Sequence, residues 1–178
     1  MNFHDYFNKA LEFEDYVKLL GENLSLHKLH YNNFDLQNKD AKSIKNLPLM
    51  NILVITEPWC GDSFALLPVV KKISEANSIW KLKIILRDKN PDLIERFLTK
   101  GGRAIPIFLF LDYNCEYLYK WGPRPLAAQN IFEQFRTQIN NGEIEKSKVI
   151  LKIRQFYSKN KGKEASQEIL NLIYSNLK

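Results

Sequence analysis

The stretch Trp59-Cys60-Gly61-Asp62-Ser63 decides the fold, together with Arg103-Ala104-Ile105-Pro106. The first stretch follows the apolar run 50–56 and precedes a helical pattern, so Cys60 is expected at a helix N-terminus. Unpaired backbone N–H groups and the positive end of the helix dipole favour a thiolate at such a place, and a pKa below that of a free thiol. Proline lacks a hydrogen-bond donor, which confines Pro106 to the start of a strand. The two stretches predict a reactive cysteine at a helix N-terminus and a strand that begins with proline.

Around these stretches, the apolar pattern alternates between strands and helices. Strands are predicted at 50–56, 80–87, 105–111 and 116–121, and helices at 5–20, 22–36, 39–46, 62–77, 91–100, 126–140, 143–158 and 163–177. The order within 50–140 requires an α/β fold with a mixed sheet, because crossover connections make parallel neighbours and the hairpin adds an antiparallel pair. Helices are expected on both faces of this sheet.

The length of 178 residues, 45% of them hydrophobic, suits one compact unit. We divide it into an N-terminal helical extension at 1–49, the α/β domain at 50–141 and a C-terminal helical appendage at 142–178 that packs on the same domain. The proline at Leu47-Pro48 and the sequence Asn140-Asn141-Gly142 mark the two boundaries.

Composition argues against several classes of function. The net charge of +6 is concentrated in residues 143–178 and no nucleic-acid-reading motif accompanies it, so a solvated basic surface is expected rather than a nucleic-acid partner. No apolar run approaches the ~20 residues of a membrane span, and the N-terminus does not resemble a secretory signal. Two cysteines make no disulfide framework, so we expect a cytoplasmic protein in a reducing environment.

Four stretches share their order and spacing with one known family: Ile52-Leu53-Val54 before Trp59-Cys60-Gly61, Pro68, Asp88-Lys89-Asn90-Pro91 and Arg103-Ala104-Ile105-Pro106. In these features the chain resembles thioredoxins, and residues 89–125 look like a bacterial branch of thioredoxin-like proteins with a Trp-Cys-Gly-Asp motif. The resemblance implies a thioredoxin fold with extra helices at both ends. It also implies a cis peptide bond before Pro106 and a substrate groove between Pro106 and Cys60.

Three positions depart from the thioredoxin pattern. Ser63 stands where the resolving cysteine would be, so Cys60 cannot close an intramolecular disulfide. Val54 replaces a buried aspartate that assists that cysteine, and without the cysteine a buried acid would only be costly. Asp62 replaces a proline; its carboxylate opposes a Cys60 thiolate but favours the helix N-terminus. The sequence is therefore a monothiol Cys-x-x-Ser variant.

The candidate site consists of two groups of residues. Cys60 and Ser63 are the catalytic candidates; the Ser63 hydroxyl either donates a hydrogen bond to the Cys60 thiolate or caps the helix. The substrate-binding candidates are Trp59, Gly61, Asp62, Arg103, Ile105, Pro106 and Arg124. The two arginines either hold a carboxylate such as that of glutathione or lie in solvent.

Two other sets of residues receive no role. Cys115 falls in the turn of the predicted hairpin, where we expect it to be exposed and, at the far end of a strand, beyond disulfide reach of Cys60. His27 and His30 can share a helix face, but no carboxylate or thiol completes a ligand set, so no metal site is assigned.

Two hypotheses from different classes follow. The first is thiol–disulfide exchange at Cys60, in which a mixed disulfide with a protein or with glutathione is resolved by an external thiol and no cofactor is needed. The alternative is a non-catalytic binding module that uses the proline groove and the added helices. A third hypothesis, a metal–sulfur cluster held with glutathione as in monothiol glutaredoxins, fits the Trp-Cys-Gly-Asp context less well.

Overall fold

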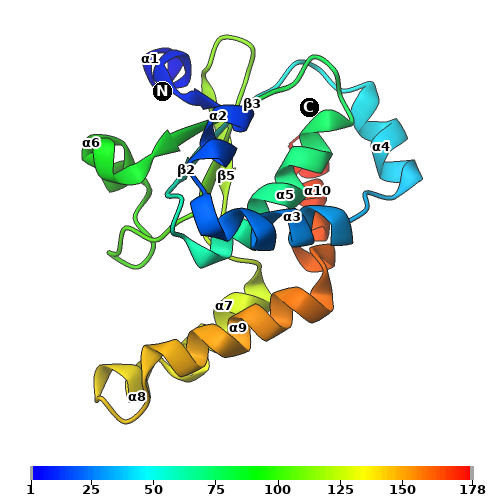
Figure 1. Cartoon of the computed structure of the whole chain (residues 1–178). Coiled ribbons are helices and arrows are strands. Elements are labelled where there is room, and N and C mark those ends of the chain that lie inside the picture. Colours follow the sequence, from blue (N-terminus) through cyan, green and yellow to red (C-terminus); the bar gives the residue numbers. More distant parts are fainter. Residues whose placement is uncertain (1, 177–178) are drawn as a thin grey trace.

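A five-stranded mixed sheet in the order β1-β3-β2-β4-β5 lies at the centre of the computed structural model, which describes residues 2–176 (Figure 1). Its strands are β1 (Leu11–Glu12), β2 (Asn51–Thr56), β3 (Lys81–Leu86), β4 (Ile107–Leu111) and β5 (Tyr117–Trp121). Strand β2 is parallel to β3 and antiparallel to β4, and β4 pairs antiparallel with β5. The predicted α/β fold is confirmed. Residues 1, 177 and 178 of the predicted extensions lie outside the described range.

Helices surround this sheet. The α-helices are α1 (His4–Lys9), α2 (Phe13–Lys18), α3 (Leu24–Asn33), α4 (Asn38–Lys45), α5 (Gly61–Glu75), α6 (Pro91–Ile94), α7 (Leu126–Gln134), α8 (Arg136–Asn140), α9 (Lys146–Asn160) and α10 (Lys163–Ser175), and the 3₁₀ helices are η1 (Gly21–Asn23), η2 (Arg87–Lys89) and η3 (Glu95–Phe97). Among residues 2–176, none of them is long and apolar enough to cross a lipid bilayer.

The two faces of the sheet bury separate apolar cores. Alternate side chains of a strand point to opposite faces, and in β2 Ile52 and Val54 belong to one core while Leu53 and Ile55 belong to the other. The first core is filled mainly by α5 and α10, and the second by α1, α6 and η3. All six residues of β2 are buried, as expected of a strand covered on both sides.

The helix predicted at 5–20 is wrong in its middle. Leu11 and Glu12 form strand β1, which pairs antiparallel with β3, and the Lys83 ammonium lies 2.7 Å from the Glu12 carboxylate across this pair. The N-terminal extension therefore adds a strand to the sheet and is not purely helical. The apolar spacing of 5–20 suits a helix on either side of β1, and nothing in the local sequence reveals the partner strand.

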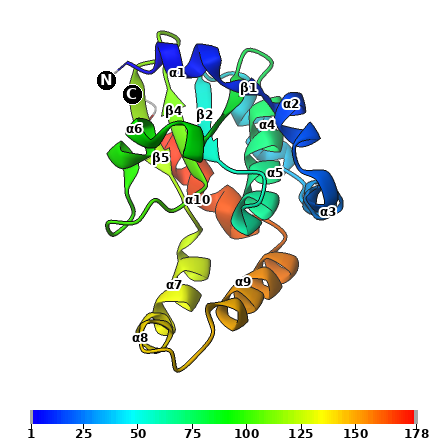
Figure 2. The ribbon, with the colours of Figure 1, turned by 60° about the vertical axis from the view of Figure 1, so that its left-hand side comes forward.

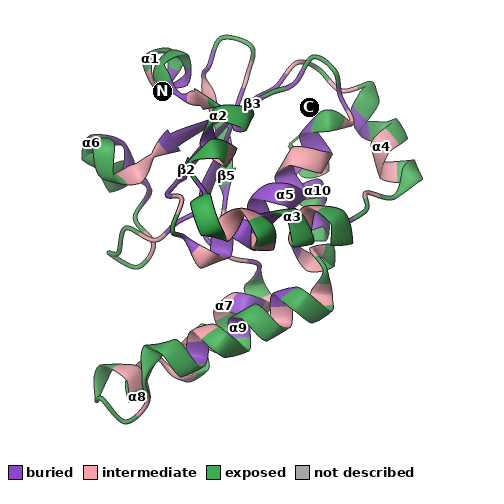
Figure 3. Ribbon diagram, in the orientation of Figure 1, coloured by how far each residue is buried: buried purple, intermediate pink, exposed green. Residues whose placement is uncertain are grey.

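Helices α7, α8 and α9, which we call the arm, project from one end of the domain (Figures 1 and 2). The helix predicted at 126–140 is divided, because Phe135 leaves the helical conformation between α7 and α8. Helix α9 runs back beside α7, and α10 returns to pack on α5. Figure 3 shows that α5 is mostly buried, whereas much of the arm is exposed.

Candidate active site

Cys60 occupies the N-cap of α5, directly after the turn that follows β2. Its backbone N–H donates to the Glu57 carbonyl over 3.0 Å, and its own carbonyl accepts the Ser63 N–H over 3.1 Å. The thiol is directed at the carbonyl of Ile105, 3.5 Å from Sγ, and the Ile105–Pro106 bond is cis. The two stretches that decided the fold thus meet with the sulfur between them, and the predicted cis bond is confirmed.

The predicted low pKa of Cys60 is wrong. Cys60 is buried, and burial raises the pKa of its thiol above the ordinary value because the thiolate would lose its hydration. Hydrogen bonds from Ser63 and from the first backbone N–H groups of α5 act to lower the pKa, while the Asp62 carboxylate raises it further. The position at a helix N-terminus suggested a low pKa for the thiol. Burial of the sulfur by tertiary packing has the larger effect on this pKa, and it acts in the opposite direction.

This shift has a measurable consequence. The thiolate is the form that reacts with alkylating agents. We expect the rate of iodoacetamide alkylation at Cys60, followed by peptide mass mapping, to rise with pH and to show its inflection above the ~8.5 of a free cysteine. An inflection below pH 8 would contradict the effect of burial.

Ser63 lies behind Cys60, in the first turn of α5. Its buried hydroxyl shares a short hydrogen bond with Thr56 at the end of β2. It also lowers the pKa of Cys60 by hydrogen bonding. Val54 is fully buried in the apolar core on the α5 side of the sheet. At the position of a resolving cysteine the protein therefore has the Ser63 hydroxyl, which is hydrogen-bonded to the end of strand β2.

Asp62 joins the active-site helix to the arm. Its Oδ2 accepts a hydrogen bond from Nε of Arg124 at 2.8 Å and lies 2.7 Å from Nη2 of the same guanidinium, and its Oδ1 accepts a hydrogen bond from the Tyr157 hydroxyl at 2.8 Å. The side chains of Asp62 and Arg124 are only 10% and 14% exposed. Arg124 thus lies at the site as the sequence predicted, but its guanidinium group is already paired with the Asp62 carboxylate. Sequence reasoning missed Tyr157, which comes from α9, 95 positions further along the chain.

Arg87 is a second residue that sequence reasoning missed. Its guanidinium carbon lies 4.9 Å from the centre of the Trp59 ring, and its Nη1 donates to the Arg103 carbonyl over 3.1 Å. Arg87 therefore ties the loop before Cys60 to the loop before Pro106. Arg103 is half-exposed and makes an ion pair with Glu95.

A groove of about 420 Å³ opens beside the sulfur. Of the predicted site residues it is lined by Trp59, Cys60, Gly61, Asp62, Arg103, Ile105 and Arg124. Pro106 and Ser63 are buried behind this surface. The opposite wall belongs to the arm and includes Phe132, Arg136, Lys146 and Ile150. The structure thus brings the candidate residues together and adds a wall that the sequence did not predict.

Gly122 packs against the proline loop. Its φ is +114°, and a Cβ at this position would lie 2.4 Å from the Pro106 carbonyl oxygen. We expect Gly122→Ala to lower the free energy of unfolding by about 1–3 kcal/mol from backbone strain, with a further loss from this contact. Urea denaturation measures it. Gly142→Ala is the control, since Gly142 also has a positive φ but no atom near its missing Cβ. Equal losses would contradict the role of the contact.

Cys115 differs from the prediction of an exposed turn residue. It has the expected place, in the turn between β4 and β5 at the end of β4 remote from Pro106, but its side chain is only 5% exposed. Phe3 donates its N–H to the Cys115 carbonyl over 2.8 Å, so the N-terminal segment covers the turn. Burial raises the pKa of this thiol. Cys115 is a core residue.

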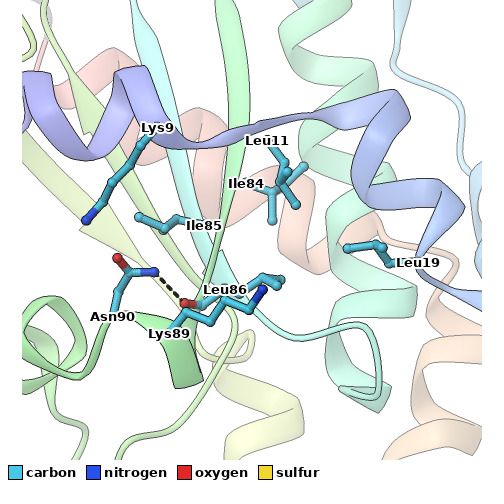
Figure 4. Close-up of a pocket in the computed structure, with 8 residues that line it drawn as sticks. All are labelled: Lys9, Leu11, Leu19, Ile84, Ile85, Leu86, Lys89 and Asn90. Atoms are coloured by element: carbon cyan, nitrogen blue, oxygen red, sulfur yellow. Dashed lines mark hydrogen bonds between the residues drawn. The ribbon is translucent and has the colours of Figure 1, made fainter.

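Two other features lie apart from Cys60. His27 is buried in α3 against Phe13, and the described part of the chain contains no cluster of three side chains suited to a metal ion. An apolar groove of about 500 Å³ lies along the outer edge of β3 (Figure 4). There Asn90 donates to the Leu86 carbonyl over 2.8 Å, and no cysteine lines this groove.

A cysteine at the start of α5, a cis proline opposite it and the mixed sheet beneath define the thioredoxin-like class of proteins. A family model described as thioredoxin matches residues 10–136. The chain therefore belongs to this thioredoxin family. The match ends before α9, so α9 and α10 lie beyond it.

The whole chain resembles two solved structures. One is a protein of unknown function from Pseudomonas aeruginosa, with a TM-score of 0.70, 18% identity and coverage of 98% of each chain. The other is an HIV epitope scaffold, with a TM-score of 0.69, 18% identity and coverage of 98% of this chain and 99% of that one. At this identity the likeness shows the fold. No curated protein gives a significant match.

Proposed function

We propose that the protein performs monothiol thiol–disulfide exchange at Cys60. The observation that carries the proposal is the position of the Cys60 sulfur at the N-terminus of α5, in the wall of an open groove and against the Ile105 carbonyl beside the cis proline. A substrate that enters this groove meets the sulfur in its wall.

The reaction has two steps. The Cys60 thiolate attacks one sulfur of a disulfide, a new S–S bond forms, the old S–S bond breaks and the leaving thiolate takes up a proton. Ser63 cannot repeat this attack, so a second thiol from solution must cleave the mixed disulfide and restore the Cys60 thiol. In a reducing cytoplasm, glutathione is the abundant candidate, and the half-exposed Arg103 is the better placed of the two predicted arginines to meet its carboxylates.

Oxidised glutathione tests this function directly. We expect incubation to add about 305 Da to the protein, the mass of one glutathionyl group, at Cys60. The Cys60→Ser variant is the control and should gain nothing at this position. Because the pKa of Cys60 is raised, the adduct should form faster at pH 9 than at pH 7. An adduct that maps to Cys115 alone would end the proposal.

Insulin reduction separates this chemistry from that of a dithiol thioredoxin. We expect the wild-type protein to show no catalytic turnover with thioredoxin reductase as the source of electrons, because Ser63 cannot release the bound substrate. Rapid wild-type turnover would refute the monothiol mechanism.

One observation favours the alternative of a non-catalytic binding module. Burial raises the pKa of Cys60, which leaves little thiolate at neutral pH. Mixed-disulfide formation with oxidised glutathione distinguishes the two functions, since an exchange enzyme forms the adduct at Cys60 and a binding module does not need to.

A further inference from the structure

We propose that the groove beside Cys60 binds an extended acidic segment of a partner protein, held by a cationic stripe on α9 that consists of Lys146, Ile150 and Arg154. The inference rests on the proposed function in one respect, since the bound segment would present the sulfur that reacts with Cys60. It names the substrate class of that site. The family match ends at residue 136 and therefore includes no residue of α9.

The three residues of the stripe face the start of α5. Positions four apart lie on the same face of a helix. Lys146 and Ile150 line the groove that contains Cys60. Ile150 and Arg154 line an adjoining cavity of about 80 Å³ together with Gly61. Nη2 of Arg154 lies 3.6 Å from the place that a Cβ on Gly61 would take, so the stripe follows the edge of the active site.

The two cations of the stripe are unpaired. Within residues 2–176, Lys146 and Arg154 have no carboxylate partner. Every other cation that lines the groove has one, in the pairs Arg87–Asp88, Arg103–Glu95, Arg124–Asp62 and Arg136–Glu133. Two cations without counter-charges beside a reactive sulfur complement a ligand that carries carboxylates.

The spacing of the stripe matches an extended chain. Lys146 and Arg154 are eight residues apart, or about 12 Å along a helix. Carboxylates four residues apart on an extended peptide are separated by about 13 Å and point to the same side. The half-buried Ile150 offers an apolar contact between them. A segment with two acidic residues separated by three others therefore fits the stripe better than a nucleic acid, whose charges follow one another at about 3.4 Å along each strand.

A fluorescent peptide without cysteine tests the inference on the reduced full-length protein. The probe has ten residues, with two glutamates four apart and a serine between them, and its twin has glutamines in their place. At low salt, we expect the acidic probe to bind about five- to tenfold more tightly by fluorescence anisotropy, as for two partly exposed ion pairs. Lys146→Gln with Arg154→Gln should abolish the difference, and 0.5 M salt should reduce it strongly.

Lys148→Gln is the matched control, because Lys148 is an exposed cation of α9 that lines neither cavity. It should keep the preference. Equal binding of the two peptides, an unchanged preference in the double variant, or tighter binding of a single-stranded oligonucleotide would overturn the inference. Since the probe has no thiol, its binding does not depend on exchange chemistry. If the acidic probe binds selectively but oxidised glutathione forms no adduct at Cys60, the proposed function is refuted and the present inference stands.

Discussion

Replacement of Asp62 by alanine should lower the free energy of unfolding by about 3–5 kcal/mol, a large part of the stability of a domain of this size. The loss arises because Arg124 and Tyr157, the buried partners of the carboxylate, remain in place. Arg124 is largely buried, forms an ion pair with Asp62 and donates one hydrogen bond to it, and the Tyr157 hydroxyl donates a second. Without the carboxylate, the buried guanidinium keeps only the long 3.5 Å hydrogen bond from its Nη1 to Gln129, and the buried Tyr157 hydroxyl has no acceptor. Urea denaturation measures the change.

The same substitution should make Cys60 more acidic. The Asp62 carboxylate raises the pKa of the Cys60 thiol, and Arg124 remains nearby after its removal. We therefore expect Asp62→Ala to lower the pH at which alkylation of Cys60 shows its inflection while it destabilises the fold. A double variant, Asp62→Ala with Arg124→Met, removes both charges and should be more stable than Asp62→Ala alone. A loss below about 1 kcal/mol in the single variant would show that water replaces the carboxylate at little cost.

Acid should destabilise the protein through His27. Burial, reinforced by the nearby charge of His30, lowers the pKa of His27 from 6.5 to about 4. Its Nδ1 is buried and has no hydrogen-bond partner among the described residues. The unfolded chain binds a proton at His27 near pH 6.5 and the folded protein does so near pH 4. Stability is therefore complete above pH 6.5 and is lost as the pH falls towards 4, by up to about 3 kcal/mol.

Urea denaturation of wild-type protein and of His27→Leu between pH 7 and pH 4 isolates this contribution. The apolar variant should lose less stability over that interval, and the difference between the two curves belongs to His27. Parallel curves for wild type and His27→Leu would mean that His27 accepts its proton without leaving its packed position.

The sequence by itself determined an α/β fold with a mixed sheet, and its resemblance to thioredoxins supplied the particular fold and the place of Cys60 beside Pro106. The α/β fold depends on local rules: a cysteine before a helical pattern, a proline that opens a strand, and the alternation of strands and helices over 50–140. The sequence also determined that Ser63 leaves Cys60 without a resolving thiol, since that conclusion requires only the identity of the residue.

The tertiary structure decided the charge and the surroundings of the sulfur. Whether Cys60 is acidic depends on how deeply it is buried, and segments far away in the chain set that depth. Arg87, Tyr157 and Lys146 reach the site from β3's end and from α9, at sequence separations that no local pattern encodes. For the same reason the pairing of β1 and the burial of Cys115 were not predicted. Local chemistry places a residue on its element, and packing between elements determines what that residue can do.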